Sequence, residues 1–373
     1  MYNILTLNKI AACGTDLFDK ANYTVGDAVE NPTGILVRSA KMHDYAFGSE
    51  LLAIGRAGAG TNNIPVEKCA EQGIVVFNSP GANANAVKEL VLAGLFLASR
   101  KVTKAVTWAA ELKDKEDANV AAQVEKGKSA FGGNEILGKT LGIIGLGAIG
   151  RKVAQAANAL GMTVIGTDPF LSKEAAAELA DFCKVVDTKE EVYAVADYIT
   201  LHVPCNNDTK GFVNAEVIAQ LKDGVRILNF ARGELVNDAD LKAALTSGKV
   251  AVYVTDFPNA ETVNVDGIVA IPHLGASTVE SEDNCAIMAA NELIDYIENG
   301  NIKNSVNYPN VSLDTAGKKV TVLHKADADL SGIKADAKAT GTKKDFGYTI
   351  FAGDVDVDAI KAIPGVIRVR VIG

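Results

Sequence analysis

The sequence predicts an α/β protein with parallel sheets that carry helices on both faces. Short β-like runs alternate with helical stretches along most of the 373 residues, which is the pattern of doubly wound sheets. Aromatic residues make up only 6% of the chain and hydrophobic residues 48%. Aliphatic side chains and alanine must therefore provide the packing, as they do where helices cover a parallel sheet. This length suits two or three domains.

The first part of the chain contains three apolar runs of strand length and several helical stretches. We expect strands at residues 35–38, 51–55 and 73–77, and helices at residues 64–72, 86–99 and 103–112. The segment from Lys113 to Asn134 is charged and rich in small residues, with no clear periodicity. It therefore predicts a surface loop or arm.

From Thr140 onward the alternation is more regular. We expect strands at residues 141–144, 163–167, 198–201, 226–229, 252–255 and 269–271, and helices at residues 150–160 and 278–298. Residues 305–318 contain Asn, Pro and Gly and predict a linker. The tail predicts a strand at 320–323, a helix at 330–338, a strand at 348–352, a helix at 357–362 and a strand at 366–372. That order is typical of a small α+β module of ferredoxin-like type.

Charge and composition exclude several classes of protein. The net charge is -9 without a block of like charges, so nucleic acid and anionic membranes are not expected partners. The apolar stretch from Val87 to Ala98 is short and contains Lys88 and Glu89, which predicts a buried helix rather than a membrane span. The N-terminus has no basic region followed by a long apolar stretch, so it does not read as a secretory signal.

The cysteines and histidines form no metal-binding pattern. Five cysteines are scattered without paired spacing, at Cys13, Cys69, Cys183, Cys205 and Cys285, and there are four histidines. We expect free thiols in a reducing cytoplasm and no structural metal.

A glycine-rich turn lies between a predicted strand and a predicted helix. Gly145 allows a tight turn, Gly147 lets a pyrophosphate approach the backbone, and Gly150 lets the helix pack on the strand. The helix N-terminus offers N–H groups and partial positive charge to phosphates. The next strand ends at Asp168, whose carboxylate suits a ribose diol and would repel a 2′-phosphate. With no arginine in Pro169-Phe170-Leu171, the turn predicts NAD binding rather than NADP binding.

Polar residues follow three later strands, where ligands bind in an open α/β sheet. Arg232, Glu261 and His273 lie there, and Asp256 also ends a strand. Hydride transfer from a 2-hydroxy acid needs a base for the hydroxyl proton, and histidine suits this role. It also needs a cation that holds the carboxylate, which arginine does through its planar fork. A carboxylate such as Glu261 beside the histidine would raise the imidazole pKa and fix its tautomer.

Each of these residues also has an ordinary structural interpretation. A single arginine can be a surface charge, a glutamate a strand-end residue and a histidine a cap, so only the combination after the glycine turn favours catalysis. His202, at another strand end before Val203 and Pro204, is interpreted as structural.

Together these segments resemble the D-2-hydroxyacid dehydrogenase family, most closely its phosphoglycerate-oxidising branch. The resemblance runs from about Ile35 to Pro309, and the matching motifs are residues 37–40, 55–60, 146–150, 229–236 and 272–278. It implies NAD-dependent oxidation of 3-phospho-D-glycerate, the first step of serine biosynthesis. It also implies an Arg–Glu–His catalytic set at Arg232, Glu261 and His273.

The resemblance further implies binding residues. Cofactor contacts fall on the three glycines of the turn and on Ala148, Ile149, Asp168, Val203, Pro204, Phe230, Ala231, Arg232, Asp256, His273, Gly275 and Ala276. Substrate contacts fall on Arg38, Ser39, Arg56, Arg232 and His273, with the turn near residues 81–85. Several arginines would suit a small anionic substrate with both a carboxylate and a phosphate.

The family fold implies two Rossmann-like, doubly wound parallel-sheet domains and a small C-terminal α+β module that is ACT-like. A discontinuous substrate-binding domain would comprise residues 1–98 and 279–310, an NAD-binding domain residues 99–278, and the ACT-like domain residues 319–373. The family forms dimers through the cofactor domain, to which residues 101–134 with Trp108 would contribute. The Asn-, Pro- and Gly-containing ligand turn of serine-binding ACT domains is missing after Leu323, so serine inhibition through this tail is not expected.

Two alternatives stay open. The first is another substrate within the family, as in a hydroxypyruvate or glyoxylate reductase. The second is a non-catalytic NAD-sensing regulator like the corepressors built on the same fold. Intact catalytic residues do not separate the regulator from an enzyme, whereas the acidic charge and the ACT-like tail favour metabolism.

Overall fold

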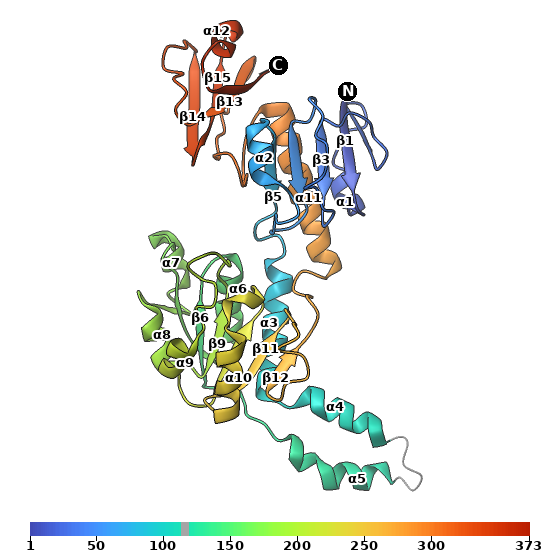
Figure 1. Ribbon diagram of the computed structural model, residues 1–373, viewed down its shortest axis with the longest axis vertical. Coiled ribbons are helices and arrows are strands. Elements are labelled where there is room, and N and C mark those ends of the chain that lie inside the picture. The colour runs from blue at the N-terminus through green and yellow to red at the C-terminus, as the bar shows by residue number, and fades with distance from the viewer. Residues whose placement is uncertain (113–118) are drawn as a thin grey trace. The chain divides into compact units, whose positions relative to one another are not determined.

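A computed structural model describes residues 1–112 and 119–373. The chain divides into two compact units, one made of residues 1–83 and 279–373 and the other of residues 84–278. Each unit has its own parallel sheet (Figure 1). No helix in the described ranges is long and apolar enough to cross a membrane.

The first unit contains a five-stranded parallel sheet in the order β2-β1-β3-β4-β5. Its strands are β1 (Tyr2–Leu7), β2 (Tyr23–Gly26), β3 (Gly34–Val37), β4 (Ala53–Arg56) and β5 (Val75–Asn78). Its helices are α1 (Ala12–Thr15), α2 (Val66–Glu71) and α11 (Val279–Asn299). All four residues of β3 are buried, as expected for a strand covered on both faces. The strands at β3, β4 and β5 were predicted to within two residues, whereas β1, β2 and α1 were missed.

The second unit contains a seven-stranded parallel sheet in the order β12-β11-β10-β9-β6-β7-β8. Its strands are β6 (Thr140–Ile144), β7 (Thr163–Thr167), β8 (Lys184–Val185), β9 (Tyr198–Leu201), β10 (Val225–Asn229), β11 (Val250–Thr255) and β12 (Ile268–Ala270). Alternate residues of each strand point to opposite faces. Ile143 therefore joins one core cluster and Ile144 the other.

Helices cover both faces of this sheet, so the predicted doubly wound arrangement is confirmed. One cluster contains residues of α3 (Ala84–Ser99) and α6 (Ala148–Ala159). The other contains residues of α8 (Lys189–Val195), α9 (Ala215–Gln220) and α10 (Asp238–Ser247). The remaining short helices are α7 (Lys173–Leu179) and the 3-10 turn η3 (Gly233–Leu235).

Two helices extend from this second unit as an arm (Figure 1). They are α4 (Val102–Glu111) and α5 (Val120–Gly127), followed by the 3-10 turn η2 (Lys128–Phe131). Neither α4 nor α5 has a buried residue, and the Trp108 ring lies 5.2 Å from the ring of Phe131. The predicted loop over residues 113–134 is thus largely helical from Val120 onward, while residues 113–118 lie outside the described part of the chain.

The C-terminal module is a four-stranded antiparallel sheet in the order β14-β15-β13-β16. Its elements are β13 (Lys319–Lys325), β14 (Ala337–Lys343), β15 (Phe346–Ala352), α12 (Val357–Lys361) and β16 (Val366–Ile372). The helix predicted at residues 330–338 is wrong. Residues 337–343 alternate between half-buried and exposed positions along β14, and this period of two fits a strand and not a helix. The module therefore lacks the first helix of a ferredoxin-like order.

One face of this small sheet belongs to the core of the first unit. Leu323, Tyr348 and Ile350 share a buried cluster with Tyr296 of α11, and the Tyr348 hydroxyl donates to the Gly300 carbonyl at 2.5 Å. The predicted linker at residues 305–318 contains no helix or strand, and it is anchored to the first unit, because Asn307 accepts the Val76 N–H and donates to the Ile74 carbonyl at 2.9 Å each.

Candidate active site

The glycine turn joins β6 to α6 in the second unit. Gly145 has φ +99°, a backbone conformation that favours glycine. A Cβ atom on Gly150 would overlap the Gly145 carbonyl oxygen. Only glycine at position 150 therefore allows the helix to lie this close to the strand. A Cβ on Gly147 would meet nothing within 4 Å. The turn is therefore open at Gly147, where Ala148 and Ile149 begin α6. The first N–H groups of a helix have no acceptor within the helix itself.

Asp168 follows β7 directly and reaches back to this turn. One carboxylate oxygen accepts the Leu146 N–H and the other accepts the Phe170 N–H, each at 2.9 Å. A carboxylate oxygen can accept a further bond, so the side chain is fixed in place and still able to bind two hydroxyls. These contacts fit the ribose role predicted for Asp168.

The loop after β9 lies against the same turn. A Cβ on Gly145 would come within 3.1 Å of the Val203 side chain and would also contact the His202 backbone. The His202 ring pairs with the Thr200 hydroxyl at 3.0 Å, and burial lowers the pKa of His202 to about 4. His202 is therefore a neutral side chain at pH 7, and the exposed Pro204 follows it along the loop.

Arg232, Asp256 and His273 follow β10, β11 and β12, three neighbouring parallel strands. Because the carboxyl ends of parallel strands meet at one edge, the three residues share that edge. The Phe257 ring lies 4.5 Å from the His273 ring, and the Arg232 guanidinium carbon lies 5.7 Å from the Phe257 ring centre. A pocket of about 650 Å³ lies here, and its lining includes Asp256, Phe257 and His273.

Asp256 is fully buried, and only one of its two carboxylate oxygens has a hydrogen-bond donor. One of its carboxylate oxygens accepts the Gly275 N–H at 3.1 Å. The other, Oδ1, has no hydrogen-bond partner, and burial raises the pKa of Asp256. A buried acceptor without a donor costs free energy, so Oδ1 suits a ligand that brings an N–H group, such as the carboxamide of a nicotinamide ring.

Asn229 organises the turn that carries Arg232. Its side chain is fully buried, and its Nδ2 donates to the Arg232 carbonyl at 2.8 Å and to the Tyr253 hydroxyl at 3.0 Å. Its Oδ1 accepts the Ala231 N–H at 3.2 Å. Asn229 was not among the site residues predicted from the sequence, although an asparagine at the end of a predicted strand, before Phe230, was a usable signal.

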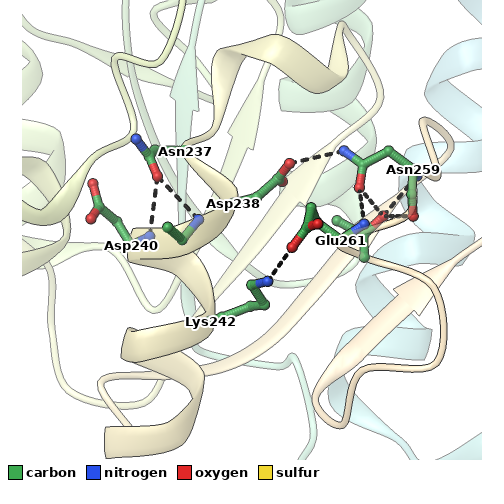
Figure 2. A network of polar contacts seen from close by, with 8 residues as sticks. Asn237, Asp238, Asp240, Lys242, Asn259 and Glu261 are labelled. Atoms are coloured by element: carbon green, nitrogen blue, oxygen red, sulfur yellow. Dashed lines mark hydrogen bonds and ion pairs between the residues drawn. The ribbon is translucent and has the colours of Figure 1, made fainter.

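Glu261 lies on a loop that is tied to α10 at two points (Figure 2). Its carboxylate pairs with Lys242, and this ion pair lowers the pKa of Glu261. Two residues earlier, Asn259 donates to Asp238 at 2.9 Å and accepts the Glu261 N–H at 2.8 Å. Among the described residues, no hydrogen bond joins Glu261 to His273. Arg232 and His273 thus lie near one aromatic ring, that of Phe257. The Glu261 carboxylate forms its ion pair with Lys242 instead of a hydrogen bond with His273.

The predicted substrate residues lie in the first unit, at the carboxyl ends of β3 and β4. Val37 pairs in register with Arg56, so Arg38 and Ser39, which follow β3, lie at the same edge of the sheet as Arg56, which ends β4. Arg38 forms an ion pair with Glu282 at 2.7 Å. A Cβ on Gly58 would overlap the Arg56 guanidinium.

Asn8 shapes the loop that carries Ser39, and it was not among the site residues predicted from the sequence. Its Oδ1 accepts the N–H groups of Ser39 and Ala40 at 3.0 and 2.7 Å. Asn8 itself has φ +71°, a conformation that asparagine tolerates better than most residues. Gly81, in the turn predicted near residues 81–85, has φ +79°.

These features define a dinucleotide-binding protein of the doubly wound class: a glycine turn before a helix, an acidic residue after the next strand, and polar residues at the strand carboxyl ends. Residues 99–276 match the family model described as "D-isomer specific 2-hydroxyacid dehydrogenase, NAD binding domain". This segment, residues 99–276, is an NAD-binding domain of the D-isomer-specific 2-hydroxyacid dehydrogenase family.

Curated relatives agree with this assignment. The D-3-phosphoglycerate dehydrogenase of Bacillus subtilis is 34% identical over 337 residues, which are 85% of this chain and 61% of the relative. The D-3-phosphoglycerate dehydrogenase of Methanocaldococcus jannaschii is 36% identical over 275 residues, covering 72% of this chain and 50% of the relative. The chain thus spans only about half to three fifths of the length of these relatives.

Solved structures show the same fold. The NAD+-bound 3-phosphoglycerate dehydrogenase of Entamoeba histolytica aligns with a TM-score of 0.63 and 27% identity, over 82% of this chain and 98% of that one. A glyoxylate reductase from Paecilomyes thermophila aligns with a TM-score of 0.65 and 26% identity, over the same shares of the two chains.

Proposed function

We propose that the protein oxidises 3-phospho-D-glycerate with NAD to 3-phosphohydroxypyruvate, the first step of serine biosynthesis. The observation that carries this proposal is the convergence of Arg232 and His273 on the Phe257 ring, beside the unsatisfied Asp256. The identity with phosphoglycerate dehydrogenases supports the choice of substrate.

The reaction removes a hydride from C2 of the substrate and a proton from its hydroxyl. His273 takes the hydroxyl proton as a general base. Arg232 binds the substrate carboxylate through its N–H fork and withdraws charge toward it. NAD, when bound, supplies the carbon that accepts the hydride.

This chain's residues would hold NAD along the carboxyl edge of the seven-stranded sheet. The open turn at Gly147 and the start of α6 would hold the pyrophosphate. Asp168 would bind the ribose hydroxyls, and Asp256 Oδ1 would accept an N–H of the nicotinamide carboxamide. The loop at Val203 and the turn at Phe230 and Ala231 would border the cofactor.

We assign Glu261 to stabilise the protonated imidazole of His273. The role requires an ionised carboxylate, and the Lys242 ion pair favours that form. We assign Arg38, Ser39 and Arg56 to the remaining substrate charges, because phosphate is bound by arginine forks and backbone N–H groups.

We further propose the family's domain arrangement, with a substrate-binding domain of residues 1–98 and 279–310, an NAD-binding domain of residues 99–278 and an ACT-like domain of residues 319–373. A cytoplasmic homodimer follows from the same reasoning. The apolar side chains exposed on the arm, Val102, Val106 and Val120, support pairing of two chains there.

An activity screen tests the proposal. Purified protein is given NAD and 3-phosphoglycerate, and NADH formation is followed by absorbance. In the reverse direction, NADH oxidation is compared for 3-phosphohydroxypyruvate, hydroxypyruvate and glyoxylate. The proposal expects kcat/KM to be highest for the phosphorylated keto acid.

Two other results would replace the proposal. Preference for glyoxylate or hydroxypyruvate would assign the protein to the reductases, an alternative that the aligned glyoxylate reductase favours. Tight NAD binding without turnover of any 2-hydroxy acid would identify a regulator.

A further inference from the structure

The Phe257 ring lies near both His273 and Arg232 at the reacting centre. Its ring centre lies 4.5 Å from the His273 ring with an interplanar angle of 43°. The same ring lies 5.7 Å from the Arg232 guanidinium carbon. The first distance is within the range of favourable aromatic pairs, and the second is within the range of cation–π contacts.

The position of Phe257 is fixed from two sides. Its backbone N–H donates to the Thr255 hydroxyl at 3.0 Å, which sets the direction of the chain as it leaves β11. On the other side, a Cβ on Gly233 would lie 3.3 Å from the Phe257 Cβ. The turn after β10, which carries Arg232, therefore packs directly on this residue.

Arg232 is held by two contacts that leave most of its donors available. Its Nη1 donates to the Ala231 carbonyl at 2.6 Å, and its guanidinium carbon lies 5.7 Å from the centre of the Phe257 ring. A guanidinium has five N–H donors, and in the described part of the chain only this one is used. The Arg232 guanidinium is thus already oriented before a carboxylate binds, which reduces the entropy cost of fixing this side chain when the substrate binds.

We propose that Phe257 is a positioning residue that sets the separation and orientation of the Arg232 guanidinium and the His273 imidazole. The inference rests on the proposed function, because it assumes that these two groups act on one substrate. A displacement of about 1 Å at a reacting centre can cost about a hundredfold in rate. An aliphatic side chain fills similar space but provides no ring face for either group.

The test compares Phe257→Leu, Phe257→Tyr and wild type in NAD-dependent oxidation of the preferred 2-hydroxy acid. We expect Phe257→Leu to lower kcat/KM by about ten- to a hundredfold, mostly through kcat, and the Tyr variant to stay within about threefold of wild type. The dissociation constant for NAD, measured by titration calorimetry, should change less than about twofold, because the turn and Asp168 are untouched. Phe182→Leu, which alters a half-buried ring beside another part of the sheet, is the matched control.

Each outcome decides one point. If wild type is active and the kcat/KM of Phe257→Leu is within twofold of it, the inference about Phe257 is wrong and the proposed function stands. The same holds if Phe257→Tyr is as slow as Phe257→Leu. A wild type that turns over no 2-hydroxy acid would overturn the proposed function, and this inference with it.

Discussion

Glu292 offers a test of how one buried carboxyl controls the stability of the first unit. It lies on α11 with 7% of its surface exposed. Its Oε1 accepts the Asn304 Nδ2 at 2.8 Å, and its Oε2 has no partner. Burial raises the pKa of Glu292 from 4.5 to about 8, so the folded protein keeps a proton that the unfolded chain releases.

The direction of the pH dependence follows from this difference. Well below pH 4.5 both states are protonated, and the group adds no pH dependence to the free energy of unfolding. As pH rises toward 8, only the unfolded chain ionises, so the free energy of unfolding falls. At about 1.4 kcal/mol per pH unit, the loss approaches about 5 kcal/mol and is largely complete above pH 8.

Glu292→Gln removes this dependence. The amide has nearly the same shape, is neutral at every pH, and its oxygen can still accept the bond from Asn304. We expect the stability of the variant relative to wild type to rise by about 3 to 5 kcal/mol between pH 5 and pH 8.5.

The assay is urea unfolding followed by far-UV circular dichroism at pH 5, 7 and 8.5. The single tryptophan, Trp108, lies in the other unit, so its fluorescence provides a separate check that the second unit is unchanged. Glu280→Gln, at the exposed start of the same helix, is the control and should show a pH-independent difference. A constant difference for Glu292→Gln as well would refute the reasoning.

Three further predictions follow from the contacts described. Asp168→Ala should weaken NAD binding and reduce discrimination against NADP, because the ribose carboxylate is lost; an unchanged ratio of the two dissociation constants would contradict this. His273→Ala should lower kcat by about 10²- to 10⁴-fold with little change in the NAD dissociation constant; equal losses in both would argue against a base. Arg370→Ala should lower the free energy of unfolding of the first unit, measured in urea, by about 1–3 kcal/mol, because Arg370 donates to the Tyr296 and Ile297 carbonyls at 3.2 and 2.8 Å. Arg151→Ala, which removes an exposed ion pair with Glu178, is the control. A smaller loss for Arg370→Ala than for this control would contradict the prediction.

Local pattern was enough to predict six of the seven strands of the second unit, but β8, α5 and the helices α7 to α10 were not predicted. The strand predicted at residues 163–167 has the bounds of β7, and that at 198–201 the bounds of β9, because each is a short β-rich run between breakers. Residues 330–338 were misread because a Leu and an Ile three residues apart resemble a helical face. The alternation along β14 extends beyond that window, to Lys343.

The site could be predicted only where it depends on strand order. Arg232, Asp256 and His273 each follow a strand, so chain position alone places them at one edge of the sheet. The placement of Glu261 depends on Lys242 and on Asn259 with Asp238, pairs that are 19 and 21 residues apart. No local pattern encodes such contacts, and an aromatic residue such as Phe257 after a strand usually indicates packing.

The first unit is assembled from two separate segments of the chain, residues 1–83 and 279–373, and this has a consequence during synthesis. Its central core combines Ile4 and Leu36 with Leu293 and Tyr348, whereas the second unit is one continuous stretch, residues 84–278. At about 5–20 residues per second, the synthesis of residues 279–373 is complete roughly 5 to 20 s after that of the second unit. The NAD-binding domain can therefore fold first, whereas the core around the apolar strands β1 and β3 is completed only after α11 and the C-terminal sheet have been synthesised. During that interval the nascent chain exposes its parallel strands, and chaperones that hold unpaired strands would act on this end of the protein.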